Sequence, residues 1–244
     1  MKHNKGIAIL SVVYAQTEEH KNIITRSFES IPESFYKATV VNDNTAGVDI
    51  KKYNDKVIKN PVNCLAKAWN MGLEFLFEEK DYQHVLVTNL DVSMPSNLAY
   101  TLYRASLKNT KAGMWAANPS DLFSHLEYST EYEVTETTPM KHGDGSFSCF
   151  LLSREAYEIV GKFDENYTPA YFEDCDYLER LWAAGYEPVK VLNARYFHFV
   201  QGTIKLGTEE KKTEYSEFMQ KNLEYFQKTY GKTPEHLPQD IKFN

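Results

Sequence analysis

The amino-acid sequence predicts an α/β fold with a mixed, mostly parallel central sheet flanked by helices. Strand-like and helix-like segments alternate through most of the 244 residues, and repeated strand–helix units favour parallel strands joined by right-handed crossovers. No internal repeat or low-complexity linker divides the chain, whose length suits one large or two small domains. We therefore expect a single domain.

The first half begins with a buried strand. Residues 7–13 are rich in β-branched side chains, which favour strands. Thr17 is a predicted N-cap of the next helix, and Glu18 and Glu19 follow it, where acidic side chains suit the positive end of the helix dipole. The elements predicted for this half are strands at 7–13, 38–42, 56–58 and 84–88, and helices at 18–30, at 64–79 and after Pro95.

The second half is less regular. Residues 118–146 are polar and predict a loop region. One helix opens at Glu173 and stops at Gly185, a residue type that commonly terminates helices. We interpret the aromatic stripe of the last helix as helix packing; it includes Tyr215, Phe218, Phe226 and Tyr230. The elements predicted for this half are strands at 147–152, 188–192 and 195–200, and helices at 154–160, from 173 and at 209–230.

The composition excludes several classes of protein. A formal net charge of −7 argues against nucleic-acid binding, which needs a basic surface. Cys64, Cys149 and Cys175 are too scattered for a disulfide framework or a Cys-x-x-Cys zinc site and favour a reducing compartment. No run approaches the ~20 apolar residues of a membrane span, and we interpret the apolar run at 6–15 as a strand rather than a signal peptide. We expect a cytoplasmic protein, with peripheral membrane contact left open.

Polar residues follow several predicted strands. In parallel sheets, ligands bind beyond the carboxyl ends of the strands, and Tyr14, Asp43, Asn89 and Asp91 occupy such positions. Asp91 has the chemistry to hold a divalent cation on a diphosphate, since Mg²⁺ and Mn²⁺ prefer oxygen ligands. The alternative is a strand-end Asp that accepts local backbone N–H bonds. Asn89 suits a ribose hydroxyl or a phosphate oxygen, or it simply closes the turn.

Two further groups have both a structural and a chemical interpretation. Glu173, Asp174 and Asp176 lie together at a helix start, where they suit capping or general-base catalysis. Like charges this close raise one another's pKa, which helps a base to work near neutral pH. His198 stands in a strand and is either a core residue or a metal ligand.

Three common motifs are missing from the sequence. It contains no G-x-G-x-x-G, no G-x-x-x-x-G-K-[ST] and no G-x-S-x-G. Classical dinucleotide binding, P-loop phosphate binding and α/β-hydrolase chemistry therefore lose most of their support.

Taken together, these residues resemble family 2 type glycosyltransferases of the Rossmann-like GT-A fold, in particular the rhamnosyltransferase-like enzymes. The strongest stretch runs from Phe147 to Gly185 and includes FSCFLLSRE, GKFDE and YFEDCD, followed by Leu178 and Arg180. Weaker support comes from Ile9–Tyr14, from VNDNT at 41–45, from Asn63 through Asn70 with Gly72, from Asn89-Leu90-Asp91 and from Phe226 to Gly231.

The resemblance implies a role for each candidate residue. Asp174 would be the catalytic base and Glu173 would position the acceptor, whereas Asp91 and His198 would hold a divalent Mn²⁺ or Mg²⁺. Three positions depart from the usual pattern: Asn89 replaces the first Asp of an Asp-x-Asp motif, Asn42 stands where many members have Asp, and Leu65 replaces a Gly. The residues implied for donor binding are Tyr14, Asp43, Asn70 and Asn89.

The resemblance further implies an inverting, metal-dependent transfer of a sugar from a UDP-, dTDP- or GDP-linked donor to a glycan hydroxyl, in polysaccharide or glycoconjugate synthesis. Residues 1–117 would bind the nucleotide sugar, 118–207 would bind the acceptor and carry out catalysis, and 208–244 would form a helix and tail. A non-catalytic module that binds sugar nucleotides or glycans is one alternative. A sugar nucleotidyltransferase is another, although Tyr14 to Lys21 lacks the Gly-rich, basic phosphate loop of such enzymes.

Overall fold

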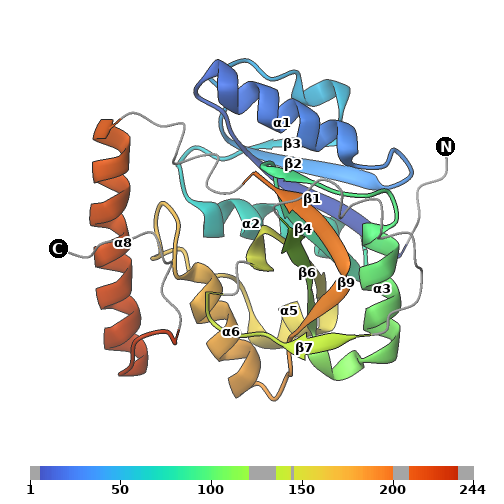
Figure 1. Ribbon diagram of the computed structural model, residues 1–244, viewed down its shortest axis with the longest axis vertical. Coiled ribbons are helices and arrows are strands. Elements are labelled where there is room, and N and C mark those ends of the chain that lie inside the picture. Colours follow the sequence, from blue (N-terminus) through green and yellow to red (C-terminus); the bar gives the residue numbers. More distant parts are fainter. Residues whose placement is uncertain (1–5, 121–135, 144–145, 200–208, 236–244) are drawn as a thin grey trace.

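A computed structural model describes residues 6–120, 136–143, 146–199 and 209–235. Within these ranges the strands form one nine-stranded sheet in the order β3-β2-β1-β4-β8-β6-β9-β5, with β7 paired to β9 (Figure 1). The strands are β1 (Ile7–Tyr14), β2 (Tyr36–Asp43), β3 (Lys56–Lys59), β4 (His84–Asn89), β5 (Val92–Ser93), β6 (Met114–Ser120), β7 (Thr137–Pro139), β8 (Cys149–Ser153) and β9 (Val189–His198).

The sheet is mixed but mostly parallel, as predicted. β3, β2, β1 and β4 pair in parallel, and β6 pairs in parallel with β9. β8 is antiparallel to both of its neighbours, β4 and β6. The short strands β5 and β7 are antiparallel to β9.

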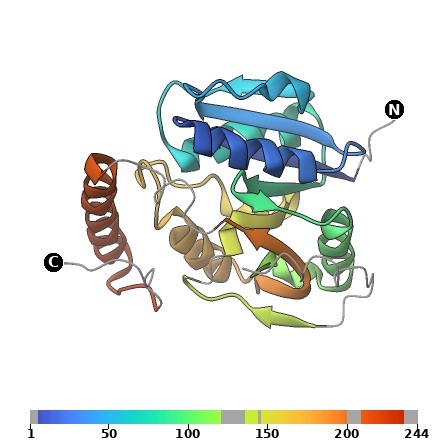
Figure 2. The same cartoon turned by 45° about the horizontal axis from the view of Figure 1, so that its top comes forward.

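Helices cover both faces of this sheet (Figures 1 and 2). The Thr17 cap is confirmed, because its Oγ1 accepts a hydrogen bond from the backbone N–H of His20 at 3.2 Å. None of the helices in the described ranges is long and apolar enough to cross a bilayer. The helices are α1 (Glu18–Ser30), α2 (Leu65–Glu74), α3 (Leu98–Lys108), α5 (Arg154–Val160), α6 (Glu173–Ala183) and α8 (Glu209–Tyr230).

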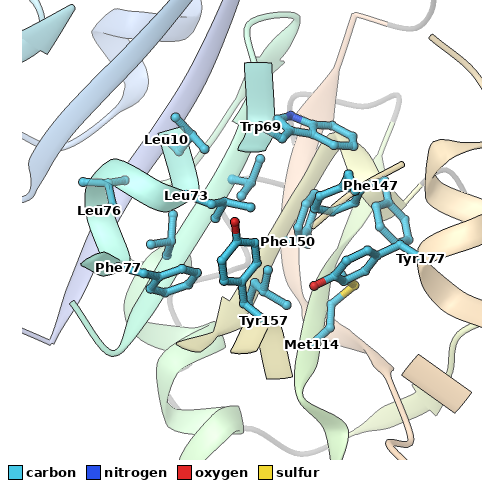
Figure 3. Packing of buried hydrophobic residues seen from close by; sticks show 14 of the residues in the cluster. Leu10, Trp69, Leu73, Leu76, Phe77, Met114, Phe147, Phe150, Tyr157 and Tyr177 are labelled. Carbon is cyan, nitrogen blue, oxygen red and sulfur yellow. The ribbon is translucent and has the colours of Figure 1, made fainter. Parts of the chain in front are cut away.

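The alternation of side chains along β1 divides the interior into two cores. Ala8, Leu10 and Val12 point into a core covered by α2, α5 and α6, whereas Ile7 and Ile9 point into a core covered by α1 and α3. This is the period of two expected for a strand buried on both faces. Figure 3 shows the first core, in which large side chains pack around Leu73 and Phe150.

The structure corrects three predicted elements. The loop expected at 118–146 contains the end of strand β6 (Met114–Ser120) and all of β7 (Thr137–Pro139), and its residues 121–135 and 144–145 lie outside the described residues. Strands predicted at 188–192 and 195–200 are one strand, β9, through residue 198; the register slips between Val191 and Arg195, so the apparent break is a bulge. The helix predicted at 64–79 is α-helical only to Glu74 and continues as a π-helical turn, Phe75–Glu79.

Candidate functional site

A cavity of about 330 Å³ opens beyond the carboxyl ends of β1 and β4. Its volume lies within the ~300–1,000 Å³ typical of small-molecule sites. Six of the eight residues predicted for the site line it, although they come from distant parts of the chain. They are Tyr14, Asn89, Asp91, Glu173, Asp174 and His198.

Pairing between β5 and β9 brings Asp91 to His198. Val92 is the register partner of His198, and the backbone N–H of Phe199 donates to the carbonyl of Asp91 at 2.8 Å. The side chains consequently meet, with Asp91 Oδ2 lying 3.4 Å from His198 Nε2. Ser148 Oγ lies 3.4 Å from the same ring nitrogen.

The residues of this corner fit a divalent cation. Asp91 Oδ1 is buried and has no hydrogen-bond partner among the described residues, so a metal ion would satisfy an atom that otherwise carries a desolvation cost. Carboxylate oxygen and imidazole nitrogen are both suitable ligands for Mn²⁺. Within the described ranges no cluster of three or more His, Cys, Asp and Glu side chains could hold a metal. A cation bound here would thus take further ligands beyond these two side chains, such as the oxygens of a substrate or of water.

The first turn of α6 carries the acidic cluster. Tyr171 and Phe172 precede the helix with φ values of 80° and 71°, in the left-handed region that non-glycine residues rarely adopt. Phe172 occupies the N-cap position and supplies no side-chain cap. None of the three acidic residues therefore caps the helix from that position.

The three acidic side chains have different surroundings. Asp174 Oδ1 accepts the backbone N–H of Cys175 at 2.8 Å, and Glu173 Oε2 is buried without a hydrogen-bond partner among the described residues. Asp176 instead accepts from Arg180 at 2.6 Å and from the Tyr230 hydroxyl at 2.7 Å. Glu173 and Asp174 line the cavity, whereas Asp176 ties α6 to α8.

Burial controls the protonation of the two cavity carboxyls. Glu173 is only 4 % exposed, and burial, with a contribution from the charge of Asp174, raises its pKa well above the ordinary value. Burial also raises the pKa of Asp174, which the backbone N–H of Cys175 partly opposes. A carboxyl with a raised pKa is a stronger base when ionised, as general-base catalysis near neutral pH requires.

Three tyrosines form one wall of the cavity. Tyr14 ends β1, Tyr171 precedes α6 and Tyr215 comes from α8. The rings of Tyr171 and Tyr215 lie edge to face, with centroids 6.4 Å apart. Burial is the main cause of the raised pKa of both Tyr14 and Tyr171. The sequence pattern predicts helix packing for Tyr215, since its place in an aromatic stripe does not reveal that this end of α8 reaches the cavity.

Asp43 lies beside the cavity but does not line it. Its backbone is in register with Tyr14 at the ends of β2 and β1. Its Oδ1 accepts from the backbone N–H and the hydroxyl of Thr45, and its Oδ2 accepts from Gln16 Nε2. The neighbouring residue Asn42 does line the cavity.

Asn70 is not at the cavity, so the structure does not support the donor contact expected of it. It is 2 % exposed, and its side chain pairs with the backbone N–H and carbonyl of Phe163 at 2.8 and 2.9 Å. Its amide also donates to Glu165 at 3.0 Å. Asn70 therefore fastens α2 to the segment that leads towards α6.

Sequence comparisons find partial matches. No protein-family model matches the chain. It is 45% identical over 58 residues to a galactofuranosyl glycosyltransferase of Leishmania donovani, covering 24% of this chain and 13% of that protein. It is 33% identical over 100 residues to an N-acetylglucosaminyl-diphospho-decaprenol L-rhamnosyltransferase of Mycobacterium tuberculosis, covering 40% and 30%. The matches thus span less than a third of either relative.

Solved structures resemble the chain over most of its length. The mannosyltransferase PcManGT from Pyrobaculum calidifontis, in complex with GDP-Man and Mn²⁺, matches with a TM-score of 0.60 and 14% identity, over 93% of this chain and 65% of that one. GalNAc-T7 with UDP, GalNAc and Mn²⁺ matches with a TM-score of 0.56 and 13% identity, over 79% and 43%. TarS residues 1–349 of S. aureus match with a TM-score of 0.56 and 11% identity, over 93% of this chain and 72% of that one. These likenesses confirm the predicted GT-A-like fold.

Proposed function

We propose that this chain is an inverting, metal-dependent glycosyltransferase. It would move a sugar from a nucleotide-diphosphate donor to a hydroxyl of a glycan acceptor. The observation that carries the proposal is the arrangement of one cavity, in which the Asp91–His198 pair and the Glu173–Asp174 pair line the same space. The fold and the partial similarity to sugar transferases support it.

Each pair suits one end of the reaction. Asp91 and His198 would hold Mn²⁺ or Mg²⁺ at the donor, where a bound cation would offset the negative charge of the departing diphosphate. Tyr14 and Asn89 line this part of the cavity, with Asp43 beside them, and would contact the nucleotide. The polar atoms of Asp91 and His198 are close enough to share one ligand.

Asp174 would act on the acceptor. Its carboxylate would take the proton of the acceptor hydroxyl, while that oxygen forms a bond to the anomeric carbon and the bond from carbon to the diphosphate oxygen breaks. Attack opposite the leaving group inverts the configuration. Glu173 would hold the acceptor hydroxyl in line, since a positioned reactant lowers the entropic part of the barrier.

We also propose a cytoplasmic location. The three cysteines are free and buried, which supports a protein that works in the reducing cytoplasm.

We further propose that residues 1–117 bind the donor and that 118–207 bind the acceptor. Tyr215 extends this scheme, because residues 208–244 then also contribute to the cavity.

A binding screen followed by a transfer assay tests the function. Thermal shift is measured with UDP-, dTDP- and GDP-sugars, each with and without Mn²⁺, and the donors that bind are incubated with a panel of glycan acceptors. We expect one donor class to stabilise the protein only with the cation, and transfer with inversion to follow. Binding without transfer to any acceptor would favour a non-catalytic module, and the absence of any donor binding would reject both.

A further inference from the structure

The C-terminal helix α8 contacts the strained turn before α6 through one buried amide. Asn222 is 1 % exposed, and its Nδ2 donates to the carbonyl of Ala170 at 2.9 Å and to that of Tyr171 at 3.2 Å. We propose that Asn222 is a positioning residue, which holds this turn so that Glu173 and Asp174 face the cavity. The inference rests on the proposed function, because it gives those carboxyls their task.

The turn needs such support because its backbone conformation is unfavourable. Tyr171 and Phe172 both have positive φ and neither is glycine, and conformations of this kind are energetically unfavourable. They persist only where neighbouring structure holds them. At the near end, the carbonyl of Pro169 accepts the backbone N–H of Leu65 at 2.8 Å. At the far end, the side chain of Asn222 bonds the carbonyls of Ala170 and Tyr171.

Apolar packing surrounds this amide. A third, smaller core joins α8 to the turn and to α6, and Figures 1 and 2 show α8 standing at the side of the molecule next to α6. A buried amide among apolar side chains costs free energy unless it is hydrogen-bonded, so Asn222 favours the one turn geometry that satisfies it. The buried members of this core are Tyr167, Phe172, Cys175, Met219, Leu223 and Phe226.

The position of the turn explains what Asn222 would influence. Glu173 follows Phe172 directly, so a rotation of the turn would move both carboxyls relative to the cavity. Asp91 and His198 are held by the pairing of β5 with β9, which Asn222 does not contact. Loss of Asn222 should therefore harm the acceptor side of the reaction and leave the donor side intact.

The variant Asn222→Leu tests this, since leucine has a similar size and donates no hydrogen bond. We expect kcat to fall by about 10- to 100-fold, the range expected when a reacting group is misplaced by around 1 Å, while the KM for the donor stays within about twofold. Asn222→Gln keeps the donor group and should recover part of the lost kcat. If the Leu variant does not fold, Asn222→Ala provides the same comparison, because alanine is smaller and likewise donates no side-chain hydrogen bond.

Two control variants separate positioning from stability. Gln220→Leu changes an exposed amide of the same helix, whose side chain donates to Glu224. Leu102→Ala weakens the buried core under α3 and does not touch the cavity. Both should keep the kcat of the native protein at temperatures where they remain folded. A loss of kcat in Leu102→Ala as large as that in Asn222→Leu would show that stability alone is responsible.

Hydrogen exchange supplies a readout that needs no substrate. Backbone amides within residues 170–176 should exchange faster in Asn222→Leu than in the native protein, and Leu102→Ala should not show this local change. If the native protein transfers no sugar, the proposed function fails, but exchange still decides whether Asn222 holds the turn. Unchanged exchange, or a native kcat in Asn222→Leu, would overturn the inference.

Discussion

Asp91 Oδ2 lies 3.4 Å from Nε2 of His198, although the two residues are far apart in the sequence. Their contact depends on a strand of two residues, β5, which pairs with the end of β9. The backbone N–H of Phe199 donates to the carbonyl of Asp91 and strengthens this link. One side chain thus follows β4 and the other ends β9, and the sheet brings them to one corner of the cavity.

Replacing Asp91 should abolish most cation-dependent donor binding. Substitution of groups that merely support a metal ligand costs about 10- to 100-fold in affinity, so loss of the ligand in Asp91→Asn should cost at least about as much. Calorimetric titration with the donor, with and without Mn²⁺, measures the effect. Asp49→Asn, which removes an exposed carboxylate outside the cavity, is the matched control. Native affinity in Asp91→Asn would exclude the proposed metal site.

The sequence predicted Asp91 and His198 as site residues, but it did not predict that their side chains are in contact. Polar residues at strand ends and the family resemblance both pointed to Asp91 and His198. The pairing that joins them is long-range, and Val92–Ser93 is too short to stand out as a strand. Strand β6 was not predicted for a related reason. Its sequence, MWAANPS, has no β-branched residue, and its extended conformation depends on pairing with β8 and β9.

Individual side chains show where pattern alone is insufficient. A resemblance assigns Asn70 by its position in a motif, yet the hydrogen bonds to Phe163 that occupy its amide become visible only after folding. Tyr215 belongs to an apolar stripe, and no local signal tells that α8 extends past its packing partner to the cavity. Glu173 and Asp174 were predictable as a pair, whereas the left-handed turn that aims them was not.

Removing the carboxylate of Asp174 should suppress transfer and spare donor binding. In Asp174→Asn the amide keeps the shape of the side chain but cannot accept a proton, and a positioned base contributes about 10²- to 10⁴-fold to the rate. Steady-state kinetics should show a fall in kcat of that order, while donor affinity measured by titration stays near the native value. Near-native turnover would mean that another group is the base.

Replacing Asp176, two residues further on, should mainly lower the stability of the fold. Its buried carboxylate bonds Arg180 and the hydroxyl of Tyr230, and hydrogen bonds to charged groups are worth about 1.5–3 kcal/mol each. Asp176→Ala should therefore lower the free energy of unfolding by about 3 kcal/mol or more, measured by urea denaturation. Glu158→Ala, which removes an exposed partner of Arg154 at the same i, i+4 spacing, should cost less than about 1 kcal/mol. Equal losses would show that burial of Asp176 is unimportant.

Glu173 should make stability depend on pH. Its pKa is raised in the folded state by burial and then by the charge of Asp174, so the folded protein binds a proton more readily than the unfolded chain does. The contribution of this carboxyl to stability is then fully present below the unfolded pKa of about 4.3 and is lost as the pH rises through the folded pKa.

The neutral variant Glu173→Gln isolates that contribution. It should be more stable than the native protein at pH 8, and the difference should shrink as the pH is lowered towards 4.5, as followed by urea denaturation across this range. Glu158→Gln, an exposed substitution of the same kind, should show no such trend. If the free energies of unfolding of the native protein and of Glu173→Gln differed by the same amount at every pH, the raised pKa would be contradicted.

Gly72 should be required for the close packing of α2 against β1. A Cβ placed there would lie 2.1 Å from Cδ1 and 2.7 Å from Cδ2 of Leu10, and Leu10 is fully buried (Figure 3). Gly72→Ala should therefore lower the free energy of unfolding by about 1–3 kcal/mol through overpacking, even though alanine favours helix by about 1 kcal/mol over glycine.

A double-mutant cycle distinguishes this contact from a general effect on α2. Leu10→Ala alone should cost about 2–5 kcal/mol because it leaves a cavity, and the added methyl group of Gly72→Ala would partly fill that space. The double variant should then be more stable than the sum of the two losses predicts, by about 0.5–3 kcal/mol. Gly72→Ala combined with Leu86→Ala, which belongs to the core on the other face, should be additive. Coupling of equal size in both pairs would mean that the added methyl group acts on the sheet as a whole and not on Leu10.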